Sequence, residues 1–186
     1  MRPRAASSRR AVPRVKPKRR RGRQRGRPTP ADYRLVPALA AAKEIVRPAL
    51  AHRRFELPVY APAWLTPRGR YPRSTGVAPS PRLYVLTDRG GGRHRAYRLV
   101  VAEDETQGQY YGIEGTSWRS PPLLSGKHRS VRMAGRSYRV YYDGGHIRRV
   151  ARLTERGAYW VSNTLSRDIS NRRMLGIARS LTRIPR

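Results

Sequence analysis

The sequence predicts an α+β domain, in which a small antiparallel β-sheet packs against a C-terminal helix, with one N-terminal helix and a disordered basic N-terminal tail. Two observations lead to this prediction. Short segments rich in β-branched and aromatic residues follow one another between glycine-containing turns. A segment with apolar residues at helical spacing then closes the chain, and nowhere do strands and helices alternate as they do in parallel α/β folds.

The predicted strands lie between residues 83 and 162. They are expected at Leu83–Leu86, Tyr97–Ala102, Gln109–Ile113, Val131–Met133, Arg136–Tyr142, His146–Leu153 and Ala158–Ser162. Ala134-Gly135 and Asp143-Gly144-Gly145 predict tight hairpin turns, because glycine supplies the positive φ that such turns need. The strands after residue 130 should therefore form a meander.

The N-terminal helix is predicted from its capping residues and its alanines. Thr29 can cap a first turn, with Pro30 in that turn and Asp32 at the reciprocal capping position. The helix proper is expected over Ala38–Val46 and should end at Pro48, since proline cannot donate the helical hydrogen bond.

The C-terminal helix has a clearer start and a clearer apolar face. Ser170 is the expected N-cap, and Ile169 before it can pack against Met174 as a hydrophobic staple. The apolar side chains recur at positions i, i+3, i+4 and i+7, which brings them onto one helical face: Met174, Ile177, Ala178 and Leu181. This face can cover one side of the sheet.

Composition divides the chain into four segments. Residues 1–28 contain no aromatic residue, no Leu and no Ile, so they cannot bury enough apolar surface to offset the entropy of ordering and are predicted to be disordered. Residues 29–54 form the helical segment and residues 55–82 a Pro-rich extended linker. Residues 83–184 hold the sheet and the C-terminal helix. Proline at the spacing seen in the linker limits any strand there to an edge.

The protein carries a large excess of positive charge, with 42 Lys and Arg against 11 Asp and Glu and a formal net charge of +31. Residues 1–28 hold 13 of the basic residues and no acid. Such a charge favours polyanions, whether nucleic acid, anionic lipid or acidic wall polymers. Only 4 of the basic residues are Lys, a bias that GC-rich coding also produces. The candidate polyanion-binding residues of the tail are Arg19, Arg20, Arg21, Arg23 and Arg25.

No residue pattern typical of a catalytic or metal site is present in the sequence. The one acidic cluster, Glu103-Asp104-Glu105, is expected in a solvated turn, and the four histidines lack the spacing of metal ligands. There is no Cys, and Gly90-Gly91-Gly92 lacks the Lys-Ser/Thr pair of a phosphate loop. The protein is therefore predicted not to be an enzyme and to need no cofactor.

Aromatic and arginine side chains alternate along the predicted sheet, which suits stacking on bases or sugars combined with phosphate contact. The candidate binding face consists of Tyr111, Trp118, Arg119, Arg139 and Tyr141. A sheet with one buried face produces the same pattern without any ligand. In that interpretation Tyr138, Val140 and Tyr142 share one face and Arg139 and Tyr141 the other.

Several phrases over residues 55–184 resemble a region of actinobacterial cell-envelope proteins. They include Gly108–Trp118, Ser120–Leu124, Tyr141–Gly145, Ala158–Leu165 and Met174–Leu181. In this order they are similar to the C-terminal extension of LytR-CpsA-Psr (cell-envelope-related transcriptional attenuator) proteins. The resemblance implies a bacterial, extracytoplasmic role in attaching anionic glycopolymers to peptidoglycan. The membrane helix and catalytic domain of that family have no counterpart in this sequence, so no catalytic residue carries over.

Two functions remain open from the sequence. The first is a non-enzymatic, cell-envelope-associated accessory domain that contacts an anionic wall polymer or an envelope partner protein. The alternative is a basic protein that binds nucleic acid non-specifically through its Arg-rich tail. The resemblance implies an extracytoplasmic location. The sequence offers no export signal, because Ser8–Val12 has a twin arginine but no apolar segment after it, and it offers no apolar run of about 20 residues that could cross a membrane.

Overall fold

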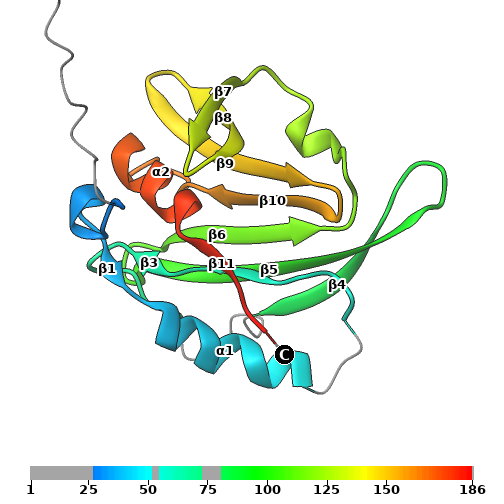
Figure 1. Ribbon diagram of the computed structural model, residues 1–186, viewed down its shortest axis with the longest axis horizontal. Coiled ribbons are helices and arrows are strands. Elements are labelled where there is room, and N and C mark those ends of the chain that lie inside the picture. Colours follow the sequence, from blue (N-terminus) through cyan, green and yellow to red (C-terminus); the bar gives the residue numbers. More distant parts are fainter. Residues whose placement is uncertain (1–26, 52–54, 73–80, 186) are drawn as a thin grey trace, which may run out of the picture.

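The computed structural model describes residues 27–51, 55–72 and 81–185, and its fold is α+β (Figure 1). A seven-stranded antiparallel sheet is flanked by an N-terminal and a C-terminal helix, as the sequence predicts. The five arginines proposed as a polyanion-binding tail (Arg19, Arg20, Arg21, Arg23 and Arg25) lie outside the described residues.

All seven predicted strands are present. They are β4 (Arg82–Thr87), β5 (Arg93–Asp104), β6 (Gln109–Thr116), β7 (Arg129–Met133), β8 (Arg136–Asp143), β9 (His146–Thr154) and β10 (Gly157–Ser162). Their order in the sheet is β4-β5-β6-β10-β9-β8-β7. Two meanders, β4 to β6 and β7 to β10, are thus joined side by side through the pairing of β6 with β10. Gly135 and Gly144 have positive φ in two of the tight turns of the second meander.

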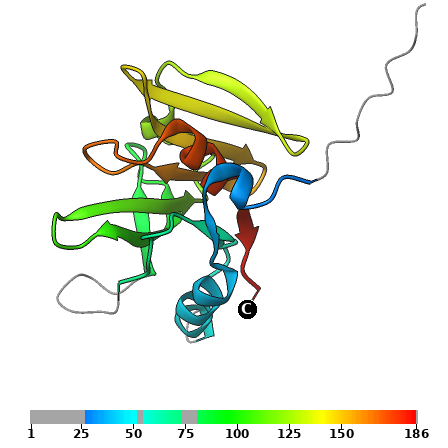
Figure 2. The ribbon, with the colours of Figure 1, turned by 90° about the vertical axis from the view of Figure 1, so that its left-hand side faces the viewer.

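The remaining elements surround this sheet. They are η1 (Ala31–Tyr33), β1 (Val36–Pro37), α1 (Leu39–Ala51), β2 (Tyr60–Pro62), β3 (Trp64–Leu65), η2 (Pro122–Leu124), α2 (Asn171–Arg179) and β11 (Leu181–Arg183). β1 pairs with β3, and β2 pairs with β11, both antiparallel. In Figure 1 β11 crosses in front of the sheet, and α2 lies against β9 and β10. Figure 2 shows α1 nearly end-on, below the sheet and close to the C-terminal end of the chain.

The helix α1 continues past Pro48 to Ala51, so the prediction that it ends at this proline is wrong. The buried side chains of the helix are Ala42, Val46 and Leu50, spaced four residues apart. Leu50 lies beyond the proline and is buried with the others, so packing of this stripe compensates for the hydrogen bond that proline cannot donate.

The two predicted N-caps have different outcomes. Thr29 is not an N-cap, so that prediction is wrong: the short 3₁₀ helix η1 has Pro30 at its N-cap position. Thr29 instead donates to Asp32 from its backbone N–H (2.7 Å) and its hydroxyl (2.9 Å). At α2 Ser170 is the N-cap residue, as predicted, although its side chain makes no capping hydrogen bond. Asn171, the next residue, binds the β8–β9 turn, because its Oδ1 accepts from the N–H of Ile147 (2.7 Å) and its Nδ2 donates to the carbonyl of Gly145 (2.9 Å).

The apolar face of α2 is buried as predicted, with Met174, Ile177 and Ala178 fully enclosed. Ile169, the predicted staple residue, is buried in the same cluster as Met174. Leu181 is also buried, but it begins the strand β11 instead of ending the helix.

Both faces of the sheet carry buried apolar side chains. The face toward α2, here the helix face, contributes Tyr97, Ile113, Val140, Tyr159 and Val161 to the main core. On the opposite face, here the loop face, a second cluster forms around Leu124 of η2: Tyr141, Ala151, Ala158 and Trp160. The Tyr141 hydroxyl donates a 2.7 Å hydrogen bond to the carbonyl of Leu124. The loop that contains η2 therefore covers the part of the sheet formed by β8 to β10.

Tyr142 lies on the face that alternation predicts, together with Tyr138 and Val140, but unlike them it is not buried. The register shift between Tyr141 and Tyr142 places the extra residue, Arg148, on β9, so Tyr142 still pairs with Ile147 of the main core. At the end of the strand Tyr142 is 38% exposed.

The described residues 55–72 of the Pro-rich segment contribute to the core, although the sequence suggests an extended linker. Phe55, Leu57, Val59, Ala61 and Leu65 are all buried and belong to the main cluster. Its strands β2 and β3 each pair with one neighbour only, in two-stranded sheets, which agrees with the edge positions that proline spacing predicts.

Asp88 closes the β4–β5 turn and makes stability depend on pH. Its Oδ1 accepts from the N–H groups of Gly90 (2.9 Å) and Gly92 (2.8 Å), and its Oδ2 lies 2.8 Å from Nε2 of His94. The hydrogen bond to His94, followed by those to the backbone, lowers the pKa of Asp88. A lowered folded-state pKa stabilises the protein above the unfolded value of about 4, and this contribution is lost as pH falls through the folded pKa.

We therefore expect the melting temperature to fall as pH decreases below about 4. Asp88→Asn should be less stable than the wild type at neutral pH and should lose part of this acid dependence. Thermal unfolding followed by circular dichroism from neutral to strongly acidic pH measures both. Parallel curves for the two proteins would show that Asp88 contributes nothing to the acid response.

Candidate anion-binding groove

Arginines from five parts of the chain line one groove on the helix face of the sheet. The groove has a cavity volume of about 790 Å³ and lies between the β7–β8 turn, the end of α2, and β11. Its arginines are Arg27, Arg136, Arg152, Arg179 and Arg183, and its other walls come from residues such as Tyr60, Trp64 and Thr182. No acidic residue is among the lining residues.

The positions of these arginines follow from the local structure. Arg136 opens β8 opposite Met133, and Arg152 on β9 pairs across the sheet with Tyr159 of β10, so both extend from the helix face. Arg179 ends α2, where a cation is favourable to the helix dipole. Arg183 on β11 stands opposite Tyr60 of β2.

The charge of the groove is not neutralised by the described part of the protein. The ion pairs among the described residues involve basic residues outside the groove: Arg68, Arg70, His94, Arg95, Arg98 and Arg167. None of the five groove arginines has a carboxylate within ion-pair distance among the described residues. Guanidinium groups stay protonated at any physiological pH, so the groove presents an unbalanced positive field to solvent.

Aromatic rings lie beside the arginines. The ring of Tyr60 meets that of Tyr159 edge-on, with centroids 4.6 Å apart, and Trp64 packs against Tyr33 at 5.8 Å. The Tyr159 hydroxyl is buried and has no hydrogen-bond partner, and burial raises its pKa, so the phenol stays neutral. Planar guanidinium donors next to aromatic walls suit a ligand that carries phosphate or carboxylate groups on an organic chain.

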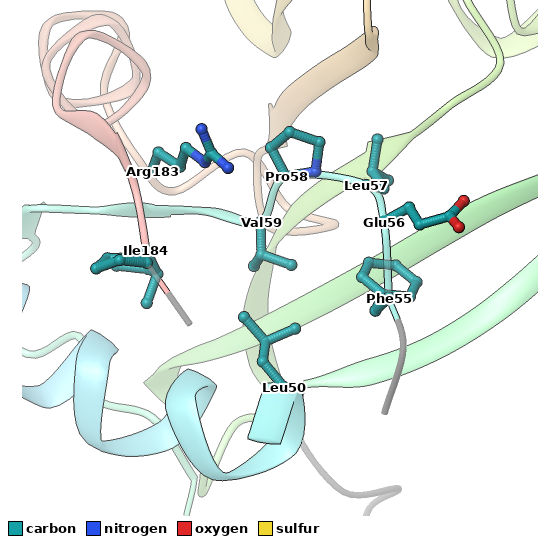
Figure 3. A pocket seen from close by; sticks show the side chains of 9 residues that line it. Leu50, Phe55, Glu56, Leu57, Pro58, Val59, Arg183 and Ile184 are labelled. Carbon is teal, nitrogen blue, oxygen red and sulfur yellow. The ribbon is translucent and has the colours of Figure 1, made fainter. Parts of the chain in front are cut away.

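A mainly apolar cavity of about 710 Å³ adjoins this groove (Figure 3). Leu50 from the end of α1, Phe55 and Val59 line it together with Ile184, whose N–H donates to the carbonyl of Val59 (2.9 Å). Arg183 lines both cavities. Among the described residues that line this apolar cavity, Glu56 and Arg183 are charged.

The structure does not unite the candidate binding face that the sequence suggests. Tyr111 is buried in the main core and Tyr141 is buried in the second cluster, on opposite faces of the sheet. Arg139 is half-buried on β8, on the same face as Tyr141. Neither tyrosine ring can therefore stack on a ligand, because the core encloses one and the η2 loop covers the other.

The two remaining members of that face follow β6. Trp118 is half-buried and stacks on His94, with ring centroids 4.7 Å apart and an interplanar angle of 13°. Arg119 next to it is exposed. The Trp118 ring thus supports the β4–β5 hairpin through His94, which binds Asp88.

The acidic cluster also differs from its predicted environment. Glu103 is buried at the end of β5, although a solvated turn is expected there. The hydroxyl of Thr66 donates a hydrogen bond to it, and Arg68 lies 3.9 Å from it. These contacts attach the Pro-rich segment to the sheet.

Sequence reasoning does not find the groove, because its five arginines are spread from residue 27 to residue 183 without a local pattern. Within the described ranges, no group of three or more His, Asp or Glu is arranged to hold a metal ion. No helix in the described part of the chain is long and apolar enough to cross a membrane. Comparisons with protein-family models, curated proteins and solved structures give no match to this chain.

Proposed function

We propose that this protein is a non-enzymatic, cell-envelope-associated domain that binds an anionic wall polymer through its arginine groove. The observation that carries the proposal is the set of five unpaired guanidinium groups around a cavity of about 790 Å³ without an acid. Guanidinium groups bind phosphate and carboxylate through two parallel hydrogen bonds, so several of them in one groove favour a ligand with repeated anionic groups.

The choice of a wall polymer rests on the resemblance of residues 55–184 to the C-terminal extension of LytR-CpsA-Psr proteins, which act on anionic glycopolymers. The aromatic walls at Tyr60 and Trp64 agree with such a ligand, because sugar or polyol units can pack on them between the charged groups. The alternative is nucleic-acid binding through the tail, supported by the net charge of +31. The two proposals use different parts of the chain and can be tested separately.

The test compares two variants of the full chain with the same loss of charge. The groove variant is Arg136→Gln/Arg152→Gln/Arg183→Gln, and the control is Arg47→Gln/Arg89→Gln/Arg93→Gln, whose three side chains are exposed and outside the groove. Binding of poly(glycerol phosphate), a phosphodiester wall polymer, is measured by calorimetry at several salt concentrations.

We expect the groove variant to bind roughly 10–100-fold more weakly at near-physiological salt, and the control to lose about threefold or less. The salt dependence should also become shallower in the groove variant, because fewer counterions are released. Equal losses in both variants would contradict the proposal, since binding would then follow net charge alone. Tight binding of duplex DNA that disappears on deletion of residues 1–26, with no binding of the wall polymer, would support the alternative.

A further inference from the structure

A second basic cavity lies at the opposite end of the β7–β8 hairpin from the groove. It has a volume of about 360 Å³ and is lined by Lys127, His128, Arg129, Tyr142, Gly144 and Gly145. No acid lines it. The neighbouring carboxylate of Asp143 is already held by the guanidinium of Arg167.

The side chains of this second cavity are available to a ligand. Lys127, His128 and Arg129 are all exposed, and Arg129 lies over the ring of Tyr142 with its guanidinium carbon 5.3 Å from the centroid. Tyr142 is one of the few large apolar side chains exposed among the described residues. This cavity therefore combines positively charged side chains with an exposed aromatic ring, as the groove does.

The hairpin brings the two cavities onto one face. Arg129 pairs with Val140 and Arg136 pairs with Met133, and both partners belong to the core on the helix face. Side chains that pair directly across two strands point the same way, so Arg129 and Arg136 extend from the same side of the hairpin. Tyr142 lies six positions after Arg136 on β8, which corresponds to about 20 Å along the strand.

The path between the cavities follows the edge of the sheet. β7 is the last strand in the sheet order and pairs only with β8 (Figure 1). Arg132 is exposed on this strand, and β7 contains no acidic residue. Arg132 pairs with Ser137 and extends from the opposite side of the hairpin. A chain of negative charges lying along β7 on the side of Arg129 and Arg136 would therefore meet basic side chains at its two ends.

We infer that the groove and the second cavity are two ends of one binding track for an extended polyphosphate or phosphodiester chain. This inference rests on the proposed function and narrows its ligand class. The ligand is then a polymer long enough to span about 20 Å, not a single terminal phosphate group. Occupying both ends at once raises affinity through effective concentration, which a short anion cannot exploit.

The test uses two inorganic probes on the full-length protein: tripolyphosphate, and long-chain polyphosphate whose length exceeds the span. Lys127→Gln/Arg129→Gln removes the charge of the second cavity, and Arg89→Gln/Arg93→Gln is the control with the same loss of charge. Both pairs are on the surface, and thermal melting verifies that the variants stay folded. Calorimetry gives the affinity of each protein for each probe.

We expect Lys127→Gln/Arg129→Gln to weaken binding of the long chain by about tenfold or more, because one of two linked contacts is lost. Its effect on tripolyphosphate, which fills the groove alone, should be no larger than that of the control. Equal weakening for both probes, or no weakening for the long chain, would overturn the track. The groove variant of three arginines should weaken both probes. If it weakens neither, the proposed function itself fails.

Discussion

Gly157→Ala is expected to cause the largest loss of stability of any single substitution considered for this protein. Gly157 begins the central strand β10 with a φ of 146°. A Cβ at this position would overlap the carbonyl oxygen of Thr116 and lie 3.0 Å from Cα of Ser117. Both are backbone atoms of the neighbouring strand end, so no side-chain movement can relieve the overlap. The pairing of β6 with β10, which joins the two meanders, must be disturbed.

The expected cost is about 4 kcal/mol or more, a large part of the roughly 5–15 kcal/mol that stabilises a typical domain. Urea unfolding followed by tryptophan fluorescence measures it. Gly126→Ala is the matched control, because a Cβ there meets no atom within 4 Å and should change stability by less than about 0.5 kcal/mol. Similar midpoints for the two variants would show that the β6–β10 junction adapts to a side chain.

Tyr97→Ala should have the next largest effect. The Tyr97 side chain is fully buried, and its hydroxyl both accepts from the N–H and donates to the carbonyl of Tyr60, each at 3.0 Å. Truncation leaves a cavity, worth about 3–5 kcal/mol for a large aromatic residue, and removes both partners of the Tyr60 backbone. Since Tyr60 belongs to β2, this single side chain attaches the β2–β11 pair to the sheet.

Tyr97→Phe separates the two contributions, because it keeps the ring and removes only the hydroxyl. It should cost about 1–3 kcal/mol, clearly less than Tyr97→Ala. Urea unfolding of both variants gives the two values. Hydrogen exchange at the Tyr60 amide should increase in Tyr97→Phe while exchange in β8 and β9 stays slow. Unchanged protection at Tyr60 would mean that the hydroxyl does not hold β2.

The sequence predicts the sheet well because its strands are local patterns. Residues such as Val131 and Tyr138 alternate with polar neighbours, and the turns at Gly135 and Gly144 need glycine for reasons that any short window reveals. The same holds for Met174 and Ile177, which show helical spacing whatever the rest of the chain does. The predicted α+β fold class rests on such local patterns, and the structure confirms it.

Errors arise where distant packing overrides a local signal. Pro48 stays within α1 because Leu50 beyond it is buried in the main core. Asn171, beside the N-cap Ser170, binds the backbone of the β8–β9 turn at Ile147 and Gly145, which lie 24 and 26 residues away in sequence. No local pattern shows such contacts.

The candidate site was beyond sequence reasoning for the same reason. An Arg-rich sequence gives no indication of which guanidinium groups lack a carboxylate partner, since that depends on which strands meet. Arg98 lies 3.7 Å from Glu114 of the neighbouring strand, whereas Arg152 has Tyr159 opposite it. The sequence also does not show that both faces of the sheet are covered, which buries Tyr111 on one face and Tyr141 on the other.

The pairing of β2 with β11 has a consequence for the synthesis of this protein. Residues 60–62 are synthesised well before their partner strand, residues 181–183. Until then β2 presents an open edge to other chains, and Arg183 cannot join the other groove arginines. The arginine groove is therefore absent from a nascent chain, however basic, until residues 181–183 have been synthesised and have paired with β2.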